Sequence, residues 1–246
     1  MTGEGPGSEI SEHRARIRRN AFLEELHYDA YRRLLEAVPP DRFPRLLEIG
    51  SGGGFLREVA PHVITSDCLA APGIDRVIDA CQLGTAFAPS ELDAICAYNV
   101  FHHLSDPASF LRGAAKVLRP GGRIALIEPW FTPIGQWIWR LLHHEPFASD
   151  PEHWGVIGEG RLDGANTRLP TSVFRDSDAR FAREFPGLSI EQREPFQKGL
   201  YLLSGGLRLN TRIPRPFARG LIDLDRKLRL GDRTLGIFGL VVVVRH

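Results

Sequence analysis

The sequence predicts an α/β protein whose parallel sheet is covered by helices on both faces. Short apolar runs typical of strands alternate with amphipathic stretches typical of helices, and one of these runs ends in a glycine-rich turn that opens a strand–turn–helix unit. The chain has 246 residues, of which 43% are hydrophobic and 25% charged, as expected for a single globular domain with a buried core. We therefore treat residues 1–246 as one domain.

The chain is expected to begin with helices. Apolar and aromatic side chains recur at helical spacing from Ile10 to Val38, Ser11 is a suitable N-cap, and Pro39 and Pro40 end the pattern. The spacing predicts one or two amphipathic helices, and we assign residues 9–38 as an N-terminal helical lid.

The next segment, residues 39–128, contains most of the expected sheet. Its apolar runs predict five strands. The stretch between the first and second strands and the stretch between the fourth and fifth predict helices. The expected strands are 45–49, 63–67, 76–79, 92–98 and 123–128, with helices over 55–60 and 107–118.

The alternation is interrupted after residue 128. Residues 129–184 are rich in Trp, His, Pro and Gly, a composition that suits an inserted cap over a pocket. Residues 185–246 return to strands, expected at 188–193 and 236–245 with a helical stretch between them.

Composition argues against several classes of protein. The formal net charge is +1, so no basic field favours nucleic acid. The start of the chain lacks a signal-peptide pattern, and the most apolar stretch, GIFGLVVVV, is shorter than a bilayer span requires. Cys68, Cys81 and Cys96 have no CxxC spacing, so neither a disulfide framework nor a zinc site is expected. We expect a cytoplasmic protein.

The glycine turn after the first strand indicates a ligand site. It reads Glu48-Ile-Gly50-Ser-Gly52-Gly-Gly54 and lacks the GxGxxG spacing of a dinucleotide site. An acid directly before the first glycine disfavours a pyrophosphate and favours a cation. A second acid, Asp67, ends the next strand, where a carboxylate accepts hydrogen bonds from ribose hydroxyls. The two acids together fit a nucleoside that carries positive charge.

These segments, taken in order, resemble the class I S-adenosylmethionine-dependent methyltransferases. The resemblance covers about residues 45–128 and rests on LLEIGSGGG, VITSD, DACQL, LDAICAYNVFHHL and VLRPGGRIALIEP. It implies a Rossmann-like, seven-stranded, mostly parallel sheet whose last strand is antiparallel. It also implies that residues 39–128 bind S-adenosylmethionine and that S-adenosylhomocysteine is the product.

The resemblance further implies which residues bind the cofactor. Glu48 lies near the methionine ammonium, Asp67 binds the ribose, Asp79 with the backbone of Ala80 recognises the adenine, and Asn99 lines the methionine side. The contacts of the turn itself come from Gly50, Ser51, Gly52 and Gly54. Only eleven residues separate Asp67 from Asp79, so the usual helix between the second and third strands is expected to be missing. For Asn99, capping of the following helix is an alternative to lining the site.

Candidate catalytic residues follow the fourth and fifth strands or lie in the cap. His102 and His103 are candidate general bases, with loop packing as the alternative, and Glu128 is expected to face the pocket as a base or orienting carboxylate, with a structural acid as the alternative. His143 and His144 are candidate pocket residues and bases. Together with Glu145 and His153 they are also the only candidate metal ligands, but they lack a helical HxxxH spacing, and we expect no metal.

Two further features have two interpretations each. Trp130, Trp137 and Trp139 either wall the acceptor pocket or pack in the core. The basic, amphipathic stretch 212–230 either packs on the sheet as a solvated helix or contacts a membrane surface, as a lipid-linked acceptor would require.

The function expected from these features is methyl transfer to a small molecule, by in-line displacement and with an oxygen preferred as acceptor. The acceptor classes considered are a specialised metabolite, a sugar and a lipid-linked molecule. The alternative is an enzyme of the same fold that uses S-adenosylmethionine for cyclisation, decarboxylation or rearrangement. No nucleic-acid partner is expected, and the oligomeric state is left open.

Overall fold

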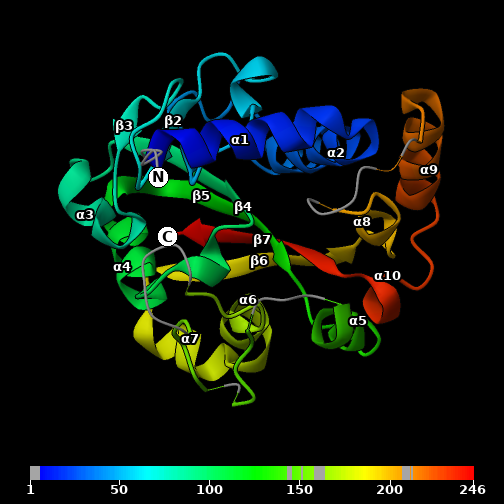
Figure 1. Cartoon of the computed structure of the whole chain (residues 1–246). Coiled ribbons are helices and arrows are strands. Elements are labelled where there is room, and N and C mark those ends of the chain that lie inside the picture. Colours follow the sequence, from blue (N-terminus) through cyan, green and yellow to red (C-terminus); the bar gives the residue numbers. More distant parts are fainter. Residues whose placement is uncertain (1–5, 143–145, 151, 158–163, 207–210, 212) are drawn as a thin grey trace, which may run out of the picture.

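The computed structural model describes residues 6–142, 146–150, 152–157, 164–206, 211 and 213–246, which form a seven-stranded sheet between two layers of helices (Figure 1). The strands are β1 Leu46–Ile49, β2 Ile64–Asp67, β3 Arg76–Val77, β4 Leu92–Tyr98, β5 Leu118–Pro129, β6 Leu188–Phe196 and β7 Phe238–Arg245. The α-helices are α1 Pro6–Arg19, α2 Ala21–Ala37, α3 Leu83–Ala86, α4 Pro107–Val117, α5 Gly135–Leu142, α6 Leu169–Thr171, α7 Asp178–Glu184, α8 Leu200–Leu203, α9 Arg215–Lys227 and α10 Asp232–Leu235. Shorter turns of helix are η1 Leu56–Glu58, η2 Ala80–Gln82, η3 Phe101–His103 and η4 Ser172–Asp176.

The strand order is β3-β2-β1-β4-β5-β7-β6. Neighbouring strands pair in parallel from β3 to β5, whereas β7 is antiparallel to both β5 and β6. The expected seven-stranded, mostly parallel sheet is confirmed. The strand order reverses between β1 and β4, and ligands of open α/β sheets bind at the carboxyl ends of the strands beside such a reversal.

The central strands are buried on both faces, which explains why their sequences are continuously apolar. Successive residues belong alternately to two hydrophobic cores because side chains alternate along a strand. In β4, Ile95 and Ala97 pack with α4, while Ala94 and Cys96 pack with α2. Each face of the sheet therefore has its own helical layer.

The N-terminal helices are divided at Asn20. Its Oδ1 accepts a hydrogen bond from the N–H of Leu23 and so caps α2, and its Nδ2 donates to the carbonyl of Ser204 at 2.7 Å. Ser11, the expected N-cap, lies inside α1, which already begins at Pro6. That prediction was wrong, and the cap that the sequence pattern missed is Asn20.

The segment assigned as a cap, residues 129–184, divides into two parts. α5 lies at one end of the strands, whereas α6, η4 and α7 cover the same sheet face as α4 through buried residues such as Phe174 and Phe181. None of the helices in the described ranges has the length and the apolar character that crossing a bilayer requires.

Candidate functional site

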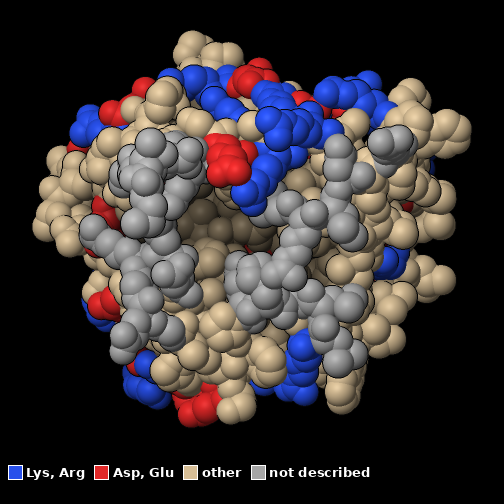
Figure 2. All heavy atoms as spheres, viewed as in Figure 1, with Lys and Arg blue, Asp and Glu red and all other residues tan. Residues whose placement is uncertain are grey.

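A cavity of about 930 Å³ lies at the carboxyl ends of β1, β2, β4 and β5. The face of the molecule shown in Figure 2 is hollowed below the N-terminal helices. Side chains from both helical layers and from the sheet contribute to the cavity lining. This is the position that the strand order predicts for a ligand site.

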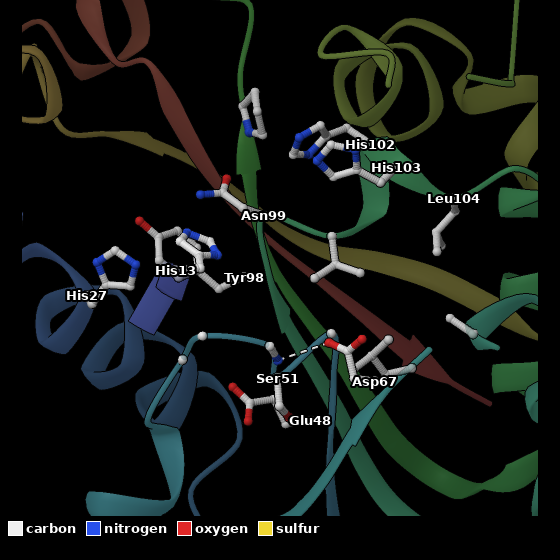
Figure 3. Close-up of a pocket in the computed structure, with 18 of the residues that line it drawn as sticks. His13, His27, Glu48, Ser51, Asp67, Tyr98, Asn99, His102, His103 and Leu104 are labelled. Carbon is white, nitrogen blue, oxygen red and sulfur yellow. Dashed lines mark hydrogen bonds between the residues drawn. The ribbon is translucent and has the colours of Figure 1, made fainter. Parts of the chain in front are cut away.

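The glycine turn forms one wall of the cavity. Gly50 has φ +63° and Gly52 φ +37°, and a Cβ on Gly50 would lie 2.4 Å from Cγ2 of Val100. Only glycine fits this backbone at Gly50. The turn is joined to β2, because the N–H of Ser51 donates to the carbonyl of Ser66 at 2.8 Å and the N–H of Gly52 donates to Asp67 Oδ2 at 3.0 Å (Figure 3).

Glu48, at the end of β1, is a buried carboxylate that lines the cavity and is 4% exposed. Burial raises the pKa of Glu48 to about 7, although a hydrogen bond from Ser51 and the charges of Arg14 and Arg57 lower it. A carboxylate that is desolvated in this way gains stability from a cationic ligand.

Asp79 and Ala80 also line the cavity, in the loop after β3. No helix lies between β2 and β3, as the short spacing predicted. Asp79 Oδ1 accepts the N–H of Cys81 at 3.0 Å and so caps η2. The shortened connection therefore leaves Asp79 beside the same cavity as Asp67.

Asn99, directly after β4, has φ +57° and lines the cavity, and its Oδ1 is a buried acceptor with no hydrogen-bond partner among the described residues. It does not cap the following helix, because the N-cap of η3 is Val100. Of the two interpretations of Asn99, the structure supports the one in which it lines the site. Such an unsatisfied buried oxygen is stabilised by a ligand that donates a hydrogen bond.

His102 and His103 both line the cavity, and their rings lie 4.1 Å apart between centroids. His102 Nδ1 lies 2.6 Å from Glu128 Oε2, and His103 Nδ1 lies 3.1 Å from the carbonyl oxygen of Gly164. Because both partners are acceptors, each histidine donates a proton from Nδ1.

The Glu128 side chain does not face the cavity, contrary to the expectation. It is fully buried and is not among the described residues that line the cavity. Its Oε1 accepts the N–H groups of Val100 at 2.8 Å and Phe101 at 2.7 Å, and its Oε2 faces His102. The end of β5 lies next to the turn after β4. The Glu128 carboxylate therefore binds the backbone of that turn and the ring of His102 and does not face the cavity.

The remaining tryptophans and histidines that were proposed as pocket residues or metal ligands do not lie together in one site. Trp139 lines the cavity, Trp130 is buried in the core outside it, and Trp137 is 56% exposed. His143 and His144 lie outside the described residues. His153 is exposed, and no group of three or more potential metal ligands occurs within the described ranges.

Several cavity residues were not anticipated from the sequence. In Figure 3, His13, His27 and Tyr98 lie on one side of Asn99, and His102 and His103 lie on the other. Burial lowers the pKa of His27 to about 4. The spacing of His27 and Tyr31, one helical turn apart in α2, was the available signal, but the same spacing also fits core packing.

Comparison with known proteins identifies relatives of the chain. A family model described as a methyltransferase domain matches residues 18–156. The 27-O-demethylrifamycin SV methyltransferase of Amycolatopsis mediterranei is 32% identical over 138 residues, which are 46% of this chain and 49% of that protein. A ubiquinone biosynthesis O-methyltransferase of Aeromonas salmonicida is 33% identical over 98 residues, which are 32% of this chain and 41% of that protein. The chain thus spans less than half the length of these relatives.

Solved structures share the fold. The crystal structure of geranyl diphosphate C-methyltransferase from Streptomyces coelicolor A3(2) matches with a TM-score of 0.52 at 14% identity, over 91% of this chain and 82% of that one. At this identity the likeness concerns the fold alone.

Proposed function

The chain belongs to the family of methyltransferase domains that matches residues 18–156, and from this membership we propose that it transfers the methyl group of S-adenosylmethionine to an oxygen atom of a small molecule. The observation that carries the proposal is the cavity of about 930 Å³. One part of it is lined by carboxylates and an amide, and another part by aromatic and aliphatic side chains. Such a cavity has room for a charged donor and an apolar acceptor.

The polar residues of the cavity fit this cofactor. Glu48, Asp67 and Asp79 supply carboxylate oxygens, and Asn99 supplies a buried oxygen that has no partner in the part of the chain that the structure describes. These acceptors match the ammonium group and the hydroxyl groups of S-adenosylmethionine. Bound in this site, it supplies an electrophilic methyl group.

We assign the roles of these residues as follows. Glu48 pairs with the ammonium group, Asp67 accepts hydrogen bonds from the ribose, and Asp79 with the backbone of Ala80 recognises the adenine. Gly50, Ser51, Gly52 and Gly54 approach the cofactor through their backbone, and Asn99 lines its methionine side. Residues 9–38 form the lid, because side chains of α1 and α2 line the same cavity.

His102 is assigned as the general base, with Glu128 as a positioning residue. The carboxylate holds the Nδ1–H tautomer of His102 and stabilises the imidazolium that forms when Nε2 accepts a proton from the acceptor hydroxyl. The partner of His103 Nδ1 is the neutral backbone carbonyl of Gly164, whereas the partner of His102 Nδ1 is a carboxylate.

Oxygen is proposed as the attacked atom for two reasons. A hydroxyl acceptor needs a base, and the cavity holds a histidine paired with a buried carboxylate. The Aeromonas salmonicida relative is named as an O-methyltransferase, and the Amycolatopsis mediterranei relative carries the oxygen position in its name.

The proposal is tested first by calorimetric titration of the purified protein with S-adenosylmethionine and S-adenosylhomocysteine. Methyl transfer from a donor labelled in the methyl group is then followed by mass spectrometry with a panel of phenols and alcohols. Binding of both cofactor forms and labelled product support the proposal. Absence of binding contradicts it, and an altered substrate without the label indicates cyclisation, decarboxylation or rearrangement instead.

For the active acceptor, we expect His102→Ala to lower kcat about 10²- to 10⁴-fold, because a positioned base is lost. The affinity for S-adenosylhomocysteine should be unchanged, and added imidazole should restore part of the rate. Glu128→Gln should lower kcat less and shift its pH dependence. A His102→Ala variant with wild-type kcat would remove this residue from the mechanism.

A further inference from the structure

The inner face of α9 packs on α2. Ala218 and Ile222 are buried there, in one apolar cluster with Phe22 and Leu26 of α2. Ion pairs join the same two helices beside this cluster: Arg215 with Glu24, Arg219 with Glu25 and Arg226 with Asp29. These contacts determine which side of α9 faces the protein and which side faces outward.

The outward side of α9 carries an exposed apolar stripe. The apolar stripe consists of Phe217, Leu221, Leu224 and the C-cap residue Leu228, whose spacing of four, three and four places them on one helix face. Their exposed fractions run from 37% to 71%, and Leu230, which follows directly, is 92% exposed. Single exposed apolar side chains are normal at a protein surface, whereas a contiguous row of them indicates a contact surface.

Exposed cations gather at the C-terminal end of the apolar stripe. Lys227 and Arg229 alternate with Leu228 and Leu230, and Arg233 follows in α10. All three cationic side chains are exposed, and Arg229 remains so although it forms an ion pair with a glutamate of β6. The outward side of this segment therefore combines apolar and cationic groups.

The acids of the same segment contribute little to its surface. Asp225 and Asp232 have side chains that are 11% and 12% exposed, and both form ion pairs with Lys198. Between residues 215 and 235, all of which the structure describes, Asp223 is the one exposed acid. The exposed charge beside the apolar stripe is thus mainly positive.

We propose that α9 docks on a membrane surface that carries anionic lipids, with the apolar stripe at the boundary between headgroups and acyl chains. A helix with an apolar side and neighbouring cations is typical of segments that lie in this boundary, because the cations meet lipid phosphates while the apolar side chains leave water. The 13 residues of α9 span about 20 Å, less than the roughly 30 Å of a hydrocarbon core, so the helix lies along the surface. This docking does not depend on the reaction that the cavity performs.

A second copy of the chain matches the charges of this surface less well. In a symmetric pair that joins two apolar stripes, the cations of one copy meet residues 215–235 of the other. That segment offers Asp223 as its one exposed acid. An anionic bilayer supplies negative charge along the whole surface.

The test uses the full chain and large vesicles of phosphatidylcholine, either alone or mixed with an equal part of phosphatidylglycerol. Sedimentation of the vesicles measures the bound fraction. We expect at least about 10-fold stronger binding to the anionic vesicles at low salt, and loss of most of this difference at about 0.5 M NaCl. Equal binding to both kinds of vesicle, or no binding to the anionic vesicles at about 1 mM lipid, would overturn the proposal.

Variants locate the surface that binds. The double variant Phe217→Ser and Leu224→Ser should weaken binding to anionic vesicles roughly 10- to 30-fold, because apolar area is removed. Lys227→Gln with Arg233→Gln should weaken it about 10-fold or more and leave binding to phosphatidylcholine unchanged. The matched control is Val77→Ser, which removes a 60% exposed apolar side chain from β3, on the opposite side of the molecule from α9 (Figure 1).

Two further measurements separate the outcomes. The substituted side chains are exposed, so each variant should keep the melting temperature of the wild type and its affinity for S-adenosylhomocysteine. Unchanged vesicle binding in the Phe217 and Leu224 double variant would contradict the proposal. A dimer that this variant dissociates, found by light scattering in a protein that does not bind vesicles, would assign the apolar stripe to a second copy instead.

Discussion

Asp67 is held in place by hydrogen bonds from the backbone. Its Oδ2 accepts the N–H of Gly52 and its Oδ1 accepts the N–H of Leu69, each at 3.0 Å. Each oxygen has a further lone pair, so the carboxylate can accept hydrogen bonds from a ligand and keep those that orient it. The acid is therefore oriented before the ligand binds.

We expect Asp67→Ala to weaken binding of S-adenosylhomocysteine roughly 10- to 100-fold, because a hydrogen bond to a charged group contributes about 1.5–3 kcal/mol. Calorimetric titration measures the change. Asp41→Ala, which removes an exposed carboxylate before β1, is the control and should leave the affinity unchanged. Unchanged affinity in Asp67→Ala would mean that the ribose is held by other residues.

Glu48 makes the stability of the ligand-free protein depend on pH. Burial raises its pKa from 4.5 to about 7 in the folded state, so the folded state binds this proton more tightly than the unfolded state. The stability that results is fully present below about pH 4.5 and is lost as the pH rises through about 7. The whole effect amounts to roughly 3 kcal/mol.

We expect the free energy of unfolding of the wild type to fall between pH 5.5 and pH 8.0 by roughly 2 kcal/mol more than that of Glu48→Gln, because the glutamine has no proton to lose. Urea unfolding at the two pH values measures both. A variant that follows the wild-type pH dependence would show that Glu48 is ionised in the folded protein throughout this range.

At the scale of single residues, the sequence could predict the groups whose positions follow from local pattern. Glu48 and Asp67 each end a strand, so their place at the carboxyl edge follows from the strand itself, and the structure puts both beside the cavity. Glu128 also ends a strand, but its side chain points to the turn after β4. His27 lies in a helix whose packing is fixed only by the folded chain. The orientations of the Glu128 and His27 side chains therefore do not follow from the residues next to them in the sequence.

Among the helices, two glycines have opposite surroundings. Gly113, inside α4, would place a Cβ 3.0 Å from the backbone N of Gly84 and 3.1 Å from Cβ of Leu83. Gly220, inside α9, would place a Cβ in open space. The first allows α4 to approach α3 closely, whereas the second only increases the conformational freedom of the unfolded chain.

We expect Gly220→Ala to stabilise the protein by roughly 0.5–1 kcal/mol and Gly113→Ala to destabilise it by roughly 1–3 kcal/mol. Urea unfolding measures both, and each variant serves as the control for the other because the substitution and the type of element are the same. Stabilisation by both substitutions would show that the backbone of η2 and α3 shifts to accommodate a methyl group at residue 113.

At the scale of elements, strand positions were predicted better than their ends. β4 occupies the predicted residues 92–98, while β5 begins at Leu118, five residues before the expected start, because Leu118 pairs with Leu92 before an irregularity in the register. The proline and glycines of this stretch suggested only a turn. Pairing with a distant strand decided the boundary, and that pairing is not a local property.

At the scale of the whole molecule, α1 lies against the glycine turn and lines the cavity. Ile10, His13 and Ile17 line the cavity, and Arg14 donates from Nε to the carbonyl of Gly54 at 3.1 Å. We expect the helix to gain contacts when a ligand fills the cavity that it lines. This is the behaviour expected of a lid.

We expect S-adenosylhomocysteine to slow amide hydrogen exchange in residues 6–19 several-fold, because a ligand in the cavity adds contacts that α1 lacks without it. Mass spectrometry of peptides measures the exchange, with α4 as the control element that does not line the cavity. Equal exchange in α1 with and without bound ligand would contradict the lid assignment.

The overall architecture could be predicted because ordered segments carried the resemblance, and both the methyltransferase family and the seven-stranded, mostly parallel sheet are confirmed. The aromatic part of the cavity lining could not be predicted. Its rings come from α2, β4, α5, α8 and β7, and no single element contributes more than two of them: His27, Tyr31, Tyr98, Trp139, Tyr201 and Phe238.

The ion pairs between α2 and α9 affect when α2 can pack during synthesis of the chain on the ribosome. Glu25 is 2% exposed, and within the described ranges its cationic partners are Arg215 and Arg219 of α9, which follow almost 200 residues later. While the ribosome is still adding the last quarter of the chain, the packing surface of α2 carries a carboxylate that must stay in water. We therefore expect α2 to dock fully only after α9 has been synthesised, and ligand binding on a translating ribosome to begin only after that point.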